Sequence, residues 1–426
     1  METNINLLLE YYQKFGIDLS LNRIENLLNL LGNPHKKVPI IHVAGTNGKG
    51  SVCAYLSSIF TQAGYKTGRY TSPHLVNWNE RICLNEQPIT EKKLIDLLTH
   101  INHIINSSSE CPTQFEVITA AAWLFFAQSQ VDIAIIEVGL GGRLDATNVC
   151  DRPLASIITS ISREHWQRLG NTLEKIATEK AGIIKQECQT IIGNLPPSAK
   201  EVVEKTVKKL NCPTIWVESA QRISKNGQNW AKYQDIEYPL SLKGDIQLQN
   251  SALAIATVKT LQSRGWDISR EAMEKGMSET RWRGRIEWVT WKGEKILIDG
   301  AHNVAASQIL REYVDTLDKE IIWVMGMLET KDHQGIFRNL LRPQDQLNLV
   351  PVPDHITATP EQLAKLATEI EPNLTKIETY QDLFLALETV IKTVNQEKQT
   401  IVICGSLYLL GYFIKLNEIS TMNSNY

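Results

Sequence analysis

The sequence has few of the features that mark an exported or membrane-bound protein. Its first residues, Met-Glu-Thr-Asn, place no basic charge ahead of an apolar stretch, so they do not resemble a signal peptide. The longest apolar run, 120–127, is far too short to cross a bilayer. We therefore expect a cytoplasmic protein with no membrane partner.

Cysteine pairs with metal-binding or disulfide-framework spacing are also absent. The seven cysteines are odd in number and include no Cys-x-x-Cys pair. Such usage fits reduced cytosolic thiols better than disulfides or a zinc site. We expect these cysteines to pack as small hydrophobic residues.

An excess of basic charge is the third missing feature. The chain carries 44 Lys and Arg against 47 Asp and Glu, which gives a net charge of -3. No broad positive field therefore favours nucleic acid or an anionic membrane as a partner. An anionic ligand must be bound locally.

Short apolar runs alternate with helical patterns along the chain. The runs are 38–44, 133–138, 154–160, 190–192, 295–298, 321–325, 347–352 and 400–404. Strands that alternate with helices predict parallel sheets of the α/β class. A polar turn at 291–294 precedes a fresh series of strands and helices, so we expect two domains, 1–292 and 293–426.

A glycine-rich segment joins the run 38–44 to a helical pattern at 52–63. Its residues are Gly45, Thr46, Asn47, Gly48, Lys49, Gly50 and Ser51. In a strand, glycine loop and helix, backbone N–H groups converge on phosphate oxygens, Lys49 can reach the terminal phosphates, and Ser51 can ligate magnesium. The usual spacing is not met, because Val43 replaces the first glycine and Gly50 separates Lys49 from Ser51. The alternative is a turn that only reverses the chain.

A carboxylate follows the second apolar run. Glu137 stands at the end of this predicted strand and is followed by the glycine-rich segment 139–142. Ligands of open α/β sheets bind at the carboxyl ends of strands, and magnesium prefers oxygen ligands. Glu137 is thus a candidate metal ligand, or else a solvated acid at a strand end.

These segments and several short motifs together resemble the folylpolyglutamate synthase and dihydrofolate synthase family of the Mur ligase superfamily. The motifs are His-Val-Ala-Gly-Thr-Asn-Gly-Lys-Gly-Ser (42–51), Thr-Ser-Pro-His-Leu (71–75), Asn-Glu-Arg-Ile (79–82), Thr-Gln-Phe-Glu (113–116), 137–148, Glu-Lys-Ala-Gly-Ile (179–183), 247–250, Arg-Gly-Arg (283–285), Asp-Gly-Ala-His-Asn (299–303) and Gly-Ser-Leu-Tyr (405–408). The resemblance implies an N-terminal domain like that of P-loop NTPases, with a mostly parallel sheet, and a smaller Rossmann-like C-terminal domain.

The resemblance also implies roles for individual residues. Magnesium would be held by Ser72, Glu137 and His165, together with Ser51 of the phosphate loop. ATP would contact the loop Gly45–Ser51 and Asn250, Arg285, Asp299 and His302. The pterin pocket would be lined by Thr113, Gln114, Phe115, Glu116, Leu144, Asp145 and Ala146, and Lys180 would be carboxylated on its amino group.

Some of these residues also have structural interpretations. His165 could be an ordinary loop histidine, His302 could fill a helix start, and Lys180 could be a solvated helix lysine. The histidines His100 and His103 have helical spacing but accompany an apolar helix face, so we interpret them as structural. Trp282, Trp288 and Trp291 could pack near the domain joint or stack on a base.

Two positions depart from the family pattern. Glu164 precedes His165 where the family has Asp, and Ile246 stands where the family has His. The longer acid can alter the geometry at His165, and the apolar side chain puts one nucleotide or hinge contact in doubt.

The resemblance implies an enzyme. We expect a monomeric ligase that uses MgATP to join L-glutamate to a folate, and also to dihydropteroate, through an acyl phosphate. Lys49, His165 and Lys180 are its expected catalytic residues. The alternatives are another Mur-type amino-acid ligase and a non-catalytic ATP-binding regulator.

Overall fold

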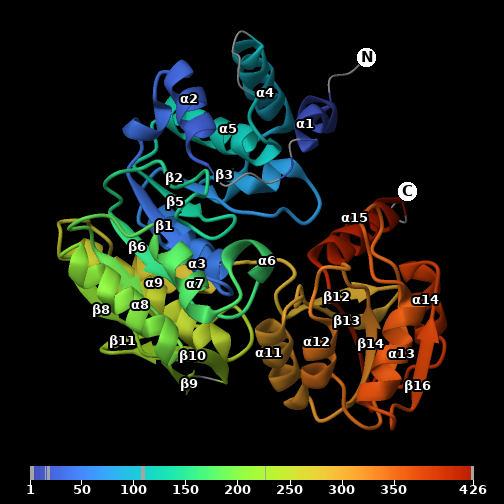
Figure 1. Cartoon of the computed structure of the whole chain (residues 1–426). Coiled ribbons are helices and arrows are strands. Elements are labelled where there is room, and N and C mark those ends of the chain that lie inside the picture. The colour runs from blue at the N-terminus through green and yellow to red at the C-terminus, as the bar shows by residue number, and fades with distance from the viewer. Residues whose placement is uncertain (1–3, 15, 17–19, 107–110, 226, 424–426) are drawn as a thin grey trace. The chain divides into compact units, whose positions relative to one another are not determined.

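The chain folds into two compact units (Figure 1). The computed structural model describes residues 4–14, 16, 20–106, 111–225 and 227–423. Unit 1 comprises Met1–Ser241 with Gln247–Arg281, and unit 2 comprises Leu242–Ile246 with Trp282–Tyr426. The domain boundary expected at 292/293 falls in the turn of a hairpin that belongs to unit 2, and it stays a prediction.

A mostly parallel sheet forms the centre of unit 1. Within the described residues it has eight strands in the order β4-β3-β2-β5-β1-β6-β7-β8. Their bounds are β1 Ile40–Ala44, β2 Thr67–Tyr70, β3 Ile82–Leu84, β4 Gln87–Pro88, β5 Ile133–Glu137, β6 Ala155–Ile158, β7 Thr190–Ile192 and β8 Thr214–Trp216. The strands β2, β5, β1, β6, β7 and β8 are parallel to one another, and β3 and β4 add an antiparallel edge. Every residue of β1 and β5 is buried, which explains their continuous apolar sequence.

Helices surround this sheet and a smaller antiparallel sheet completes unit 1. The helices are α1 Ile5–Gln13, α2 Asn22–Leu30, η1 Pro34–Lys37, α3 Lys49–Gln62, η2 Trp78–Arg81, α4 Glu91–Ile105, α5 Gln114–Ser129, α6 Trp166–Leu169, α7 Leu173–Ala181, α8 Pro197–Lys209, α9 Ile246–Gln262 and α10 Arg270–Glu279. The small sheet has the order β11-β10-β9, with β9 Gln221–Lys225, β10 Gln228–Tyr233 and β11 Ile236–Pro239. On α4 the apolar positions recur every three or four residues and are buried, while His100 and His103 are exposed.

Unit 2 is built on a second mainly parallel sheet. In the described part of the chain its order is β12-β13-β17-β14-β15-β16, and only β12 runs antiparallel to its neighbour. The strands are β12 Glu287–Trp291, β13 Glu294–Ile298, β14 Glu320–Met325, β15 Gln346–Leu349, β16 Lys376–Thr379 and β17 Gln399–Cys404. The helices are α11 Val304–Asp315, α12 His333–Leu340, α13 Pro360–Ile370, α14 Leu383–Ile391 and α15 Leu407–Asn423. Helices α11, α12 and α13 share one apolar core with the sheet, whereas α14 and α15 contact β14 and β17 outside that core.

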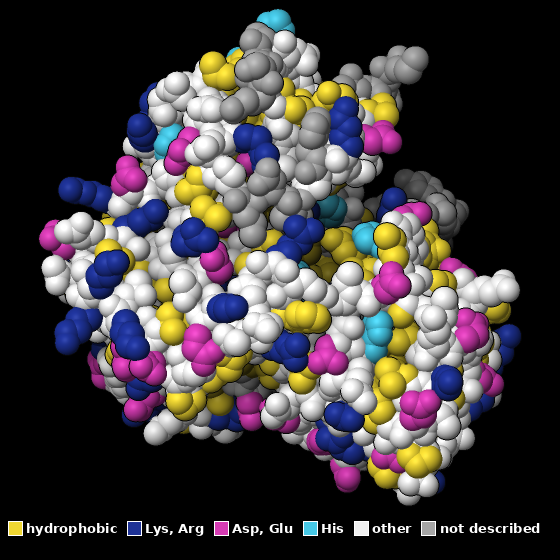
Figure 2. Space-filling view, in the orientation of Figure 1, with side chains coloured by type: hydrophobic (Ala, Val, Ile, Leu, Met, Phe, Trp, Pro, Cys, Tyr) yellow, Lys and Arg dark blue, Asp and Glu magenta, His cyan; other side chains and the backbone are white. Residues whose placement is uncertain are grey.

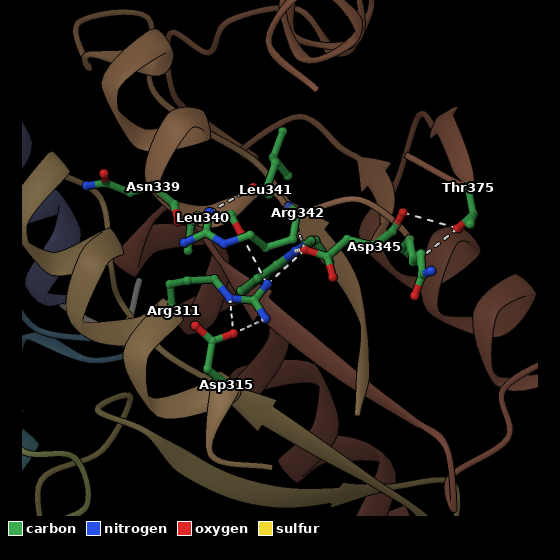
Figure 3. A network of polar contacts seen from close by, with 10 residues as sticks. Arg311, Asp315, Asn339, Leu340, Leu341, Arg342, Asp345 and Thr375 are labelled. Atoms are coloured by element: carbon green, nitrogen blue, oxygen red, sulfur yellow. Dashed lines mark hydrogen bonds and ion pairs between the residues drawn. The ribbon is translucent and has the colours of Figure 1, made fainter. Parts of the chain in front are cut away.

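A buried ion pair ties α11 to the sheet of unit 2 (Figure 3). The Nη1 of Arg311 donates to Asp345 Oδ2 at 2.8 Å and to the carbonyl oxygen of Leu340 at 3.2 Å. Asp345 Oδ2 also accepts from Trp323 Nε1 at 3.0 Å and from the backbone N–H of Arg342 at 3.1 Å. Because each charged group has several polar partners, the burial of this pair is compensated, and the network has a structural role.

The predicted strands are confirmed, with small differences at their ends. The helix expected at 52–63 begins three residues earlier, at Lys49, so the phosphate loop is shorter than the glycine-rich motif. The predicted α/β class with mostly parallel sheets is also confirmed. The strands β2, β3, β4, β8, β12 and β16 and the three strands of the β9–β11 sheet were not among the predicted runs.

The surface and the thiols agree with the composition. Figure 2 shows basic and acidic side chains interspersed over the visible face, without a field of one sign. All seven cysteines are free thiols. No helix among the described residues is long and apolar enough to cross a membrane.

Candidate functional site

Four parallel strands of unit 1 lead into candidate site residues at one edge of the sheet. Strand β1 leads into Gly45, β5 ends in Glu137, β2 is followed by Thr71 and Ser72, and β6 is followed by Thr159. These strands are neighbours in the order β2-β5-β1-β6, so their carboxyl ends lie side by side. Ligands of open α/β sheets bind at such an edge, and the order of connections reverses around β1.

The loop between β1 and α3 depends on two glycines. Gly45 has φ 152° and Gly48 has φ 89°, both in the region where a side chain is strained. A Cβ on Gly45 would lie 1.9 Å from Thr159 Oγ1, and one on Gly48 would lie 2.3 Å from Asn250 Oδ1. The tight packing of this loop therefore excludes side chains at both positions. The structure brings Asn250 of α9 to the loop, as the resemblance implies.

Residues that follow β6 bind the same loop through their hydroxyl groups. Thr159 Oγ1 donates to the carbonyl oxygen of Asn47 at 2.7 Å, and Ser160 Oγ accepts from the backbone N–H of Asn47 at 3.0 Å. Thr46 N donates to the carbonyl oxygen of Ser160 at 2.8 Å. Sequence reasoning did not identify these hydroxyls, although they end the predicted run 154–160 much as Glu137 lies near the end of the run 133–138.

Two lysines converge on one carbonyl oxygen of the loop. Lys49 Nζ donates to the carbonyl oxygens of Gly45, at 3.2 Å, and Thr46, at 3.1 Å. Lys180 Nζ, from α7, donates to the same Gly45 oxygen at 2.7 Å. The structure thus brings together two residues that are 131 positions apart in sequence (180 − 49), both predicted to be catalytic.

Lys180 is buried, with 4% of its surface exposed. Burial, and to a smaller extent the positive charge of Lys49, lower the pKa of Lys180 from 10.5 to about 7, against the opposing effect of the carboxylates of Glu164 and Asp145. A large fraction of this amine is therefore neutral near pH 7. The interpretation of Lys180 as a solvated helix lysine is wrong, because its ammonium points into the protein.

Ser51 lies in the first turn of α3 and is buried. Its hydroxyl accepts a long hydrogen bond of 3.4 Å from Gln247 Nε2, and Gln247 Oε1 accepts from Asn250 Nδ2 at 3.1 Å. Gln247 and Asn250 are one helical turn apart on α9, so one face of this helix borders the phosphate loop. Ile246, the position of the departure from the family pattern, is the first residue of α9 and is half-buried.

Glu137 and Ser72 lie beside each other at the carboxyl edge. The Ser72 backbone N–H donates to Glu137 Oε2 at 3.2 Å, and the Glu137 side chain is buried. Val43 of β1 pairs with Glu137 in the sheet, which places Glu137 next to the start of the phosphate loop. The described residues include no cluster of three or more His, Cys, Asp or Glu side chains that could hold a metal, and the expected set relies instead on two hydroxyls.

His165 is more exposed to solvent than Ser51 and Glu137. It precedes the short helix α6 with φ 49°, and 46% of its side chain is exposed. Its Nε2 lies 4.0 Å from Glu164 Oε1. Glu164, where the chain differs from the family pattern, thus lies beside His165 and within electrostatic range of Lys180. A role for His165 at the metal stays a prediction.

Asp145 organises the glycine segment that follows β5. Its carboxylate accepts from the backbone N–H groups of Leu140, at 2.8 Å, and Thr147, at 3.0 Å, and from Thr147 Oγ1 at 2.5 Å. Burial raises the pKa of Asp145, and these hydrogen bonds oppose the shift. Thr147 Oγ1 lies 2.9 Å from Nε2 of His42, a buried histidine whose pKa burial lowers to about 3. Since Thr147 donates its hydroxyl proton to Asp145, it accepts from the neutral His42.

The segment 113–116 forms the N-terminus of α5. Thr113 Oγ1 accepts from the Glu116 N–H at 3.2 Å, and Glu116 Oε2 accepts from the Thr113 N–H at 2.6 Å. Arg23 of α2 also binds the Glu116 carboxylate, with Nε 3.2 Å from Oε2. Glu116 is buried, so the structure gives it a capping role. Phe115 packs on Gly139, where a Cβ would lie 2.5 Å from its Cζ, so the start of α5 contacts the glycine segment that precedes the second expected pterin-binding segment, 144–146.

The motif at 71–82 is organised by Glu80. Its carboxylate accepts from the backbone N–H groups of Leu75, Val76 and Asn77 at 2.7 to 2.9 Å. Arg81 Nε donates to His74 Nδ1 at 2.9 Å, and burial together with the Arg81 charge lowers the pKa of His74 to about 3. These residues shape the segment that presents Ser72.

The expected nucleotide residues of unit 2 lie together. Asp299 follows β13, and its carboxylate accepts from the backbone N–H groups of Ile286 and Ala301, each at 2.8 Å. Burial raises the pKa of Asp299, although the charge of Arg285 acts in the opposite direction. Gly300 lets Arg285 approach closely, because a Cβ there would lie 2.6 Å from Arg285 Nη1. His302 Nδ1 lies 2.7 Å from the carbonyl oxygen of Gly300.

Comparison with known proteins identifies relatives along the whole chain. Residues 43–258 match the family "Mur ligase middle domain", and residues 285–416 match "Dihydrofolate synthetase, C-terminal domain". The dihydrofolate synthetase of Saccharomyces cerevisiae is 33% identical over 96% of this chain and 100% of that protein. The dihydrofolate synthase/folylpolyglutamate synthase of Bacillus subtilis is 36% identical over 77% of this chain and 80% of that protein. The folylpolyglutamate synthase of Mycobacterium tuberculosis, solved with ADP and AMPPCP, superposes with a TM-score of 0.86 at 30% identity, covering 97% of each chain.

Proposed function

The chain belongs to the dihydrofolate synthase and folylpolyglutamate synthase family, and we propose that it uses ATP to join L-glutamate to a folate through an amide bond. We further propose that it accepts dihydropteroate. The observation that carries this proposal is the meeting of the Lys49 and Lys180 side chains at the glycine loop between β1 and α3. The Lys49 cation at a phosphate loop is suited to a reaction in which an anion must approach another anion.

Phosphate binding is assigned to the loop between β1 and α3. Backbone N–H groups of Gly45, Thr46, Asn47, Gly48, Lys49, Gly50 and Ser51 would face the phosphates, and the N-terminus of α3 favours negative charge. Asn250 would complete the site in unit 1, since it touches Gly48. In unit 2 we assign nucleotide contacts to Asp299 and His302, which follow β13, and to Arg285, which approaches Gly300 between them.

The donor set at the carboxyl edge fits magnesium. Glu137 supplies a buried carboxylate, and Ser51 and Ser72 supply hydroxyl oxygens, which are the hard ligands that this ion prefers. We propose these three as ligands, with His165 as a fourth. When bound, magnesium would neutralise charge on the phosphate oxygens of ATP.

In the first step the substrate carboxylate attacks the γ-phosphorus of ATP. A bond forms between a carboxylate oxygen and phosphorus, the bond to the bridging oxygen breaks, and ADP leaves. Lys49 would hold the transferring phosphoryl group by exchanging its contacts with the Gly45 and Thr46 carbonyls for phosphate oxygens. The main contribution of the protein is to position two anions and to offset their repulsion.

In the second step the amino group of L-glutamate attacks the acyl phosphate. The amide bond forms, inorganic phosphate leaves with the electron pair of the broken C–O bond, and the amine loses a proton. This sequence needs no covalent enzyme nucleophile.

The pterin end of the substrate is assigned to two segments, and Phe115 of the first contacts Gly139, which precedes the second. We propose that Thr113, Gln114, Phe115 and Glu116 form one wall and that Leu144, Asp145 and Ala146 form another. The hydrogen bonds of Asp145 to Leu140 and Thr147 support a preformed wall. Glu116 would act through the capping box and Arg23, which hold the start of α5.

One assay separates this proposal from its alternatives. The protein would be incubated with MgATP, labelled L-glutamate and one of three acceptors: dihydropteroate, tetrahydrofolate or a muramyl nucleotide. We expect label in the folate product and in the product from dihydropteroate. Label in the muramyl nucleotide alone would show another Mur-type ligase, and no label with any acceptor would favour a non-catalytic regulator. We also propose a monomer in the cytoplasm, where reduced thiols are the rule.

A further inference from the structure

A cavity of about 500 Å³ in unit 2, open to solvent and bordered by exposed lysines, lies apart from every residue assigned above. It is lined by Lys243, Trp288, Val289, Thr290, Lys295, Leu317, Lys319, Gln396 and Thr400. Three lysines and no carboxylate contribute to this lining. In a chain with a net charge of -3, such a cavity is a local concentration of positive charge.

The cavity lies at the edge of the sheet opposite to the proposed nucleotide residues. Its lining includes Lys295 near the start of β13, Lys319 just before β14 and Thr400 near the start of β17. Asp299 follows the other end of β13, four residues from Lys295, which is about 13 Å along a strand. A ligand in this cavity would therefore not occupy the place of the Asp299 site.

The positive charges of the cavity are incompletely compensated. Among the described residues, neither Lys243 nor Lys295 forms an ion pair, and burial and the Lys295 charge both lower the pKa of Lys243. Lys319 Nζ donates to the carbonyl oxygen of Gln396 at 2.5 Å, and Gln396 Nε2 donates to the Lys295 carbonyl oxygen at 3.0 Å. Gln396 thus connects two walls, and an anion would relieve the repulsion between Lys243 and Lys295.

An aromatic wall and hydroxyl groups complete the cavity. Trp288 of β12 is half-buried, and its indole Nε1 donates to the Tyr313 hydroxyl at 3.1 Å, which fixes the ring. Thr290 and Thr400 add hydroxyl donors. The volume lies within the range of small-molecule sites.

We propose that this cavity binds a small anion with two or more phosphate groups, at a site separate from the phosphate loop. Lysines act as point charges that suit phosphate, whereas carboxylates are more often recognised by the planar fork of arginine, and no arginine lines the cavity. The proposal does not depend on the assigned ligase activity, because it concerns residues outside the proposed active site.

The test follows Trp288 itself in the full chain. In protein labelled with ¹⁵N at tryptophan, the indole signal of Trp288 is assigned by its loss in Trp288→Phe. Pyrophosphate titrated without magnesium, at constant ionic strength, is expected to shift this signal saturably. In Lys243→Ala/Lys295→Ala the half-saturating concentration should rise at least tenfold, because both unpaired charges are lost.

Lys398→Ala is the matched control, since it removes an exposed lysine near Gln396 that does not line the cavity. It should titrate as the unaltered protein does. A Trp288 signal that pyrophosphate does not move, or that moves with equal affinity in the double variant, would overturn the proposal. The phosphate loop is intact in all three proteins, so binding there cannot produce the expected difference.

Two probes distinguish the sources of the phosphate. Similar affinities for pyrophosphate and ADP would show that the phosphates alone are recognised. Tighter binding of ADP than of pyrophosphate at this signal would show that a base is recognised as well, with the Trp288 indole as the ring available for stacking. Binding of neither probe at this signal contradicts the site.

Discussion

Lys180 Nζ donates a 2.7 Å hydrogen bond to the carbonyl oxygen of Gly45, which also accepts from Lys49. One carbonyl oxygen in the protein interior therefore accepts hydrogen bonds from the amino groups of two lysines. The repulsion between them helps to keep part of the Lys180 population neutral near pH 7. A neutral amine is the form that reacts with carbon dioxide to give a carbamate.

We predict that Lys180→Ala is nearly inactive and that a short carboxylic acid partly restores turnover. The acid would replace the anionic oxygens of the carbamate in the space that the side chain leaves. Activity is measured with and without acetate or propionate, and Lys175→Ala, an exposed lysine of the same helix, is the control. Full activity of Lys180→Ala without added acid would reject the carbamate.

The same lysine predicts how stability varies with pH. In the folded state it loses its proton near pH 7, whereas in the unfolded chain it keeps the proton up to about 10.5. The unfolded chain thus binds more protons between these values, and this residue makes the free energy of unfolding rise with pH, by at most about 1.4 kcal/mol per pH unit. Below pH 7 both states are protonated and the contribution levels off.

Chemical denaturation between pH 6 and 9, in buffer free of carbon dioxide, compares the protein with Lys180→Met. The free energy of the unaltered protein should rise with pH relative to that of the variant. Parallel curves would show that the folded pKa of Lys180 is not lowered.

Lys49→Ala should leave the fold largely intact and reduce turnover roughly 100-fold or more, because the transferring phosphoryl group loses its cationic partner. The loop backbone is still expected to bind phosphate, so the ATP concentration needed for half-maximal rate should change less than kcat. Steady-state kinetics at saturating ATP measure both, and circular dichroism checks the fold. Near-normal turnover would contradict the assignment of Lys49.

Glu137→Gln should lower activity and weaken the magnesium dependence together, since an amide is a poorer ligand than a carboxylate. Affinity for magnesium is expected to fall roughly tenfold to 100-fold. The variant keeps an oxygen acceptor for the Ser72 backbone N–H, so the fold should be retained. An unchanged magnesium titration would remove Glu137 from the ligand set.

Asp145→Ala should reduce addition of glutamate to dihydropteroate more than addition to an existing folate, because this wall is assigned to the pterin of dihydropteroate. The structure adds a second expectation: the segment 140–147 loses three hydrogen bonds, so some stability is lost as well. Asp145→Asn, which keeps one acceptor oxygen, separates the two effects. An equal loss with both acceptors would assign Asp145 to the shared machinery.

The parts of the site that could be predicted from sequence are those with a local pattern. Gly45 and Gly48 adjoin an apolar strand and a helix, and Glu137 ends an apolar run, so strand ends alone predicted this edge of the sheet. The contact of Lys180 with Gly45 spans 135 residues and has no local spacing, and only the family resemblance indicated it. Thr159 and Ser160 end the predicted run 154–160, and their role was missed because hydroxyl residues at strand ends are common in ordinary structure.

Strands without apolar runs escaped prediction for a related reason. The strands β9 and β10 lie in a small sheet with many exposed residues, so their side chains lack a continuous hydrophobic pattern. Strand β12 is an antiparallel edge strand, and its tryptophans were interpreted as packing near a joint. Trp291 is buried, which confirms packing for that residue, while Trp288 lines the cavity.

The short segment Leu242–Ile246 belongs to unit 2 although it interrupts the sequence of unit 1. Leu242 is buried, and Gly244 lies so close to Ile286 that a Cβ would approach its Cδ1 to 2.6 Å. During synthesis this segment leaves the ribosome before Ile286, which it contacts, has done so. Unit 1 cannot complete its fold until residue 281 has also emerged. The two units are therefore interwoven along the chain, and a fragment cut at Trp282 would leave the Ile286 surface uncovered.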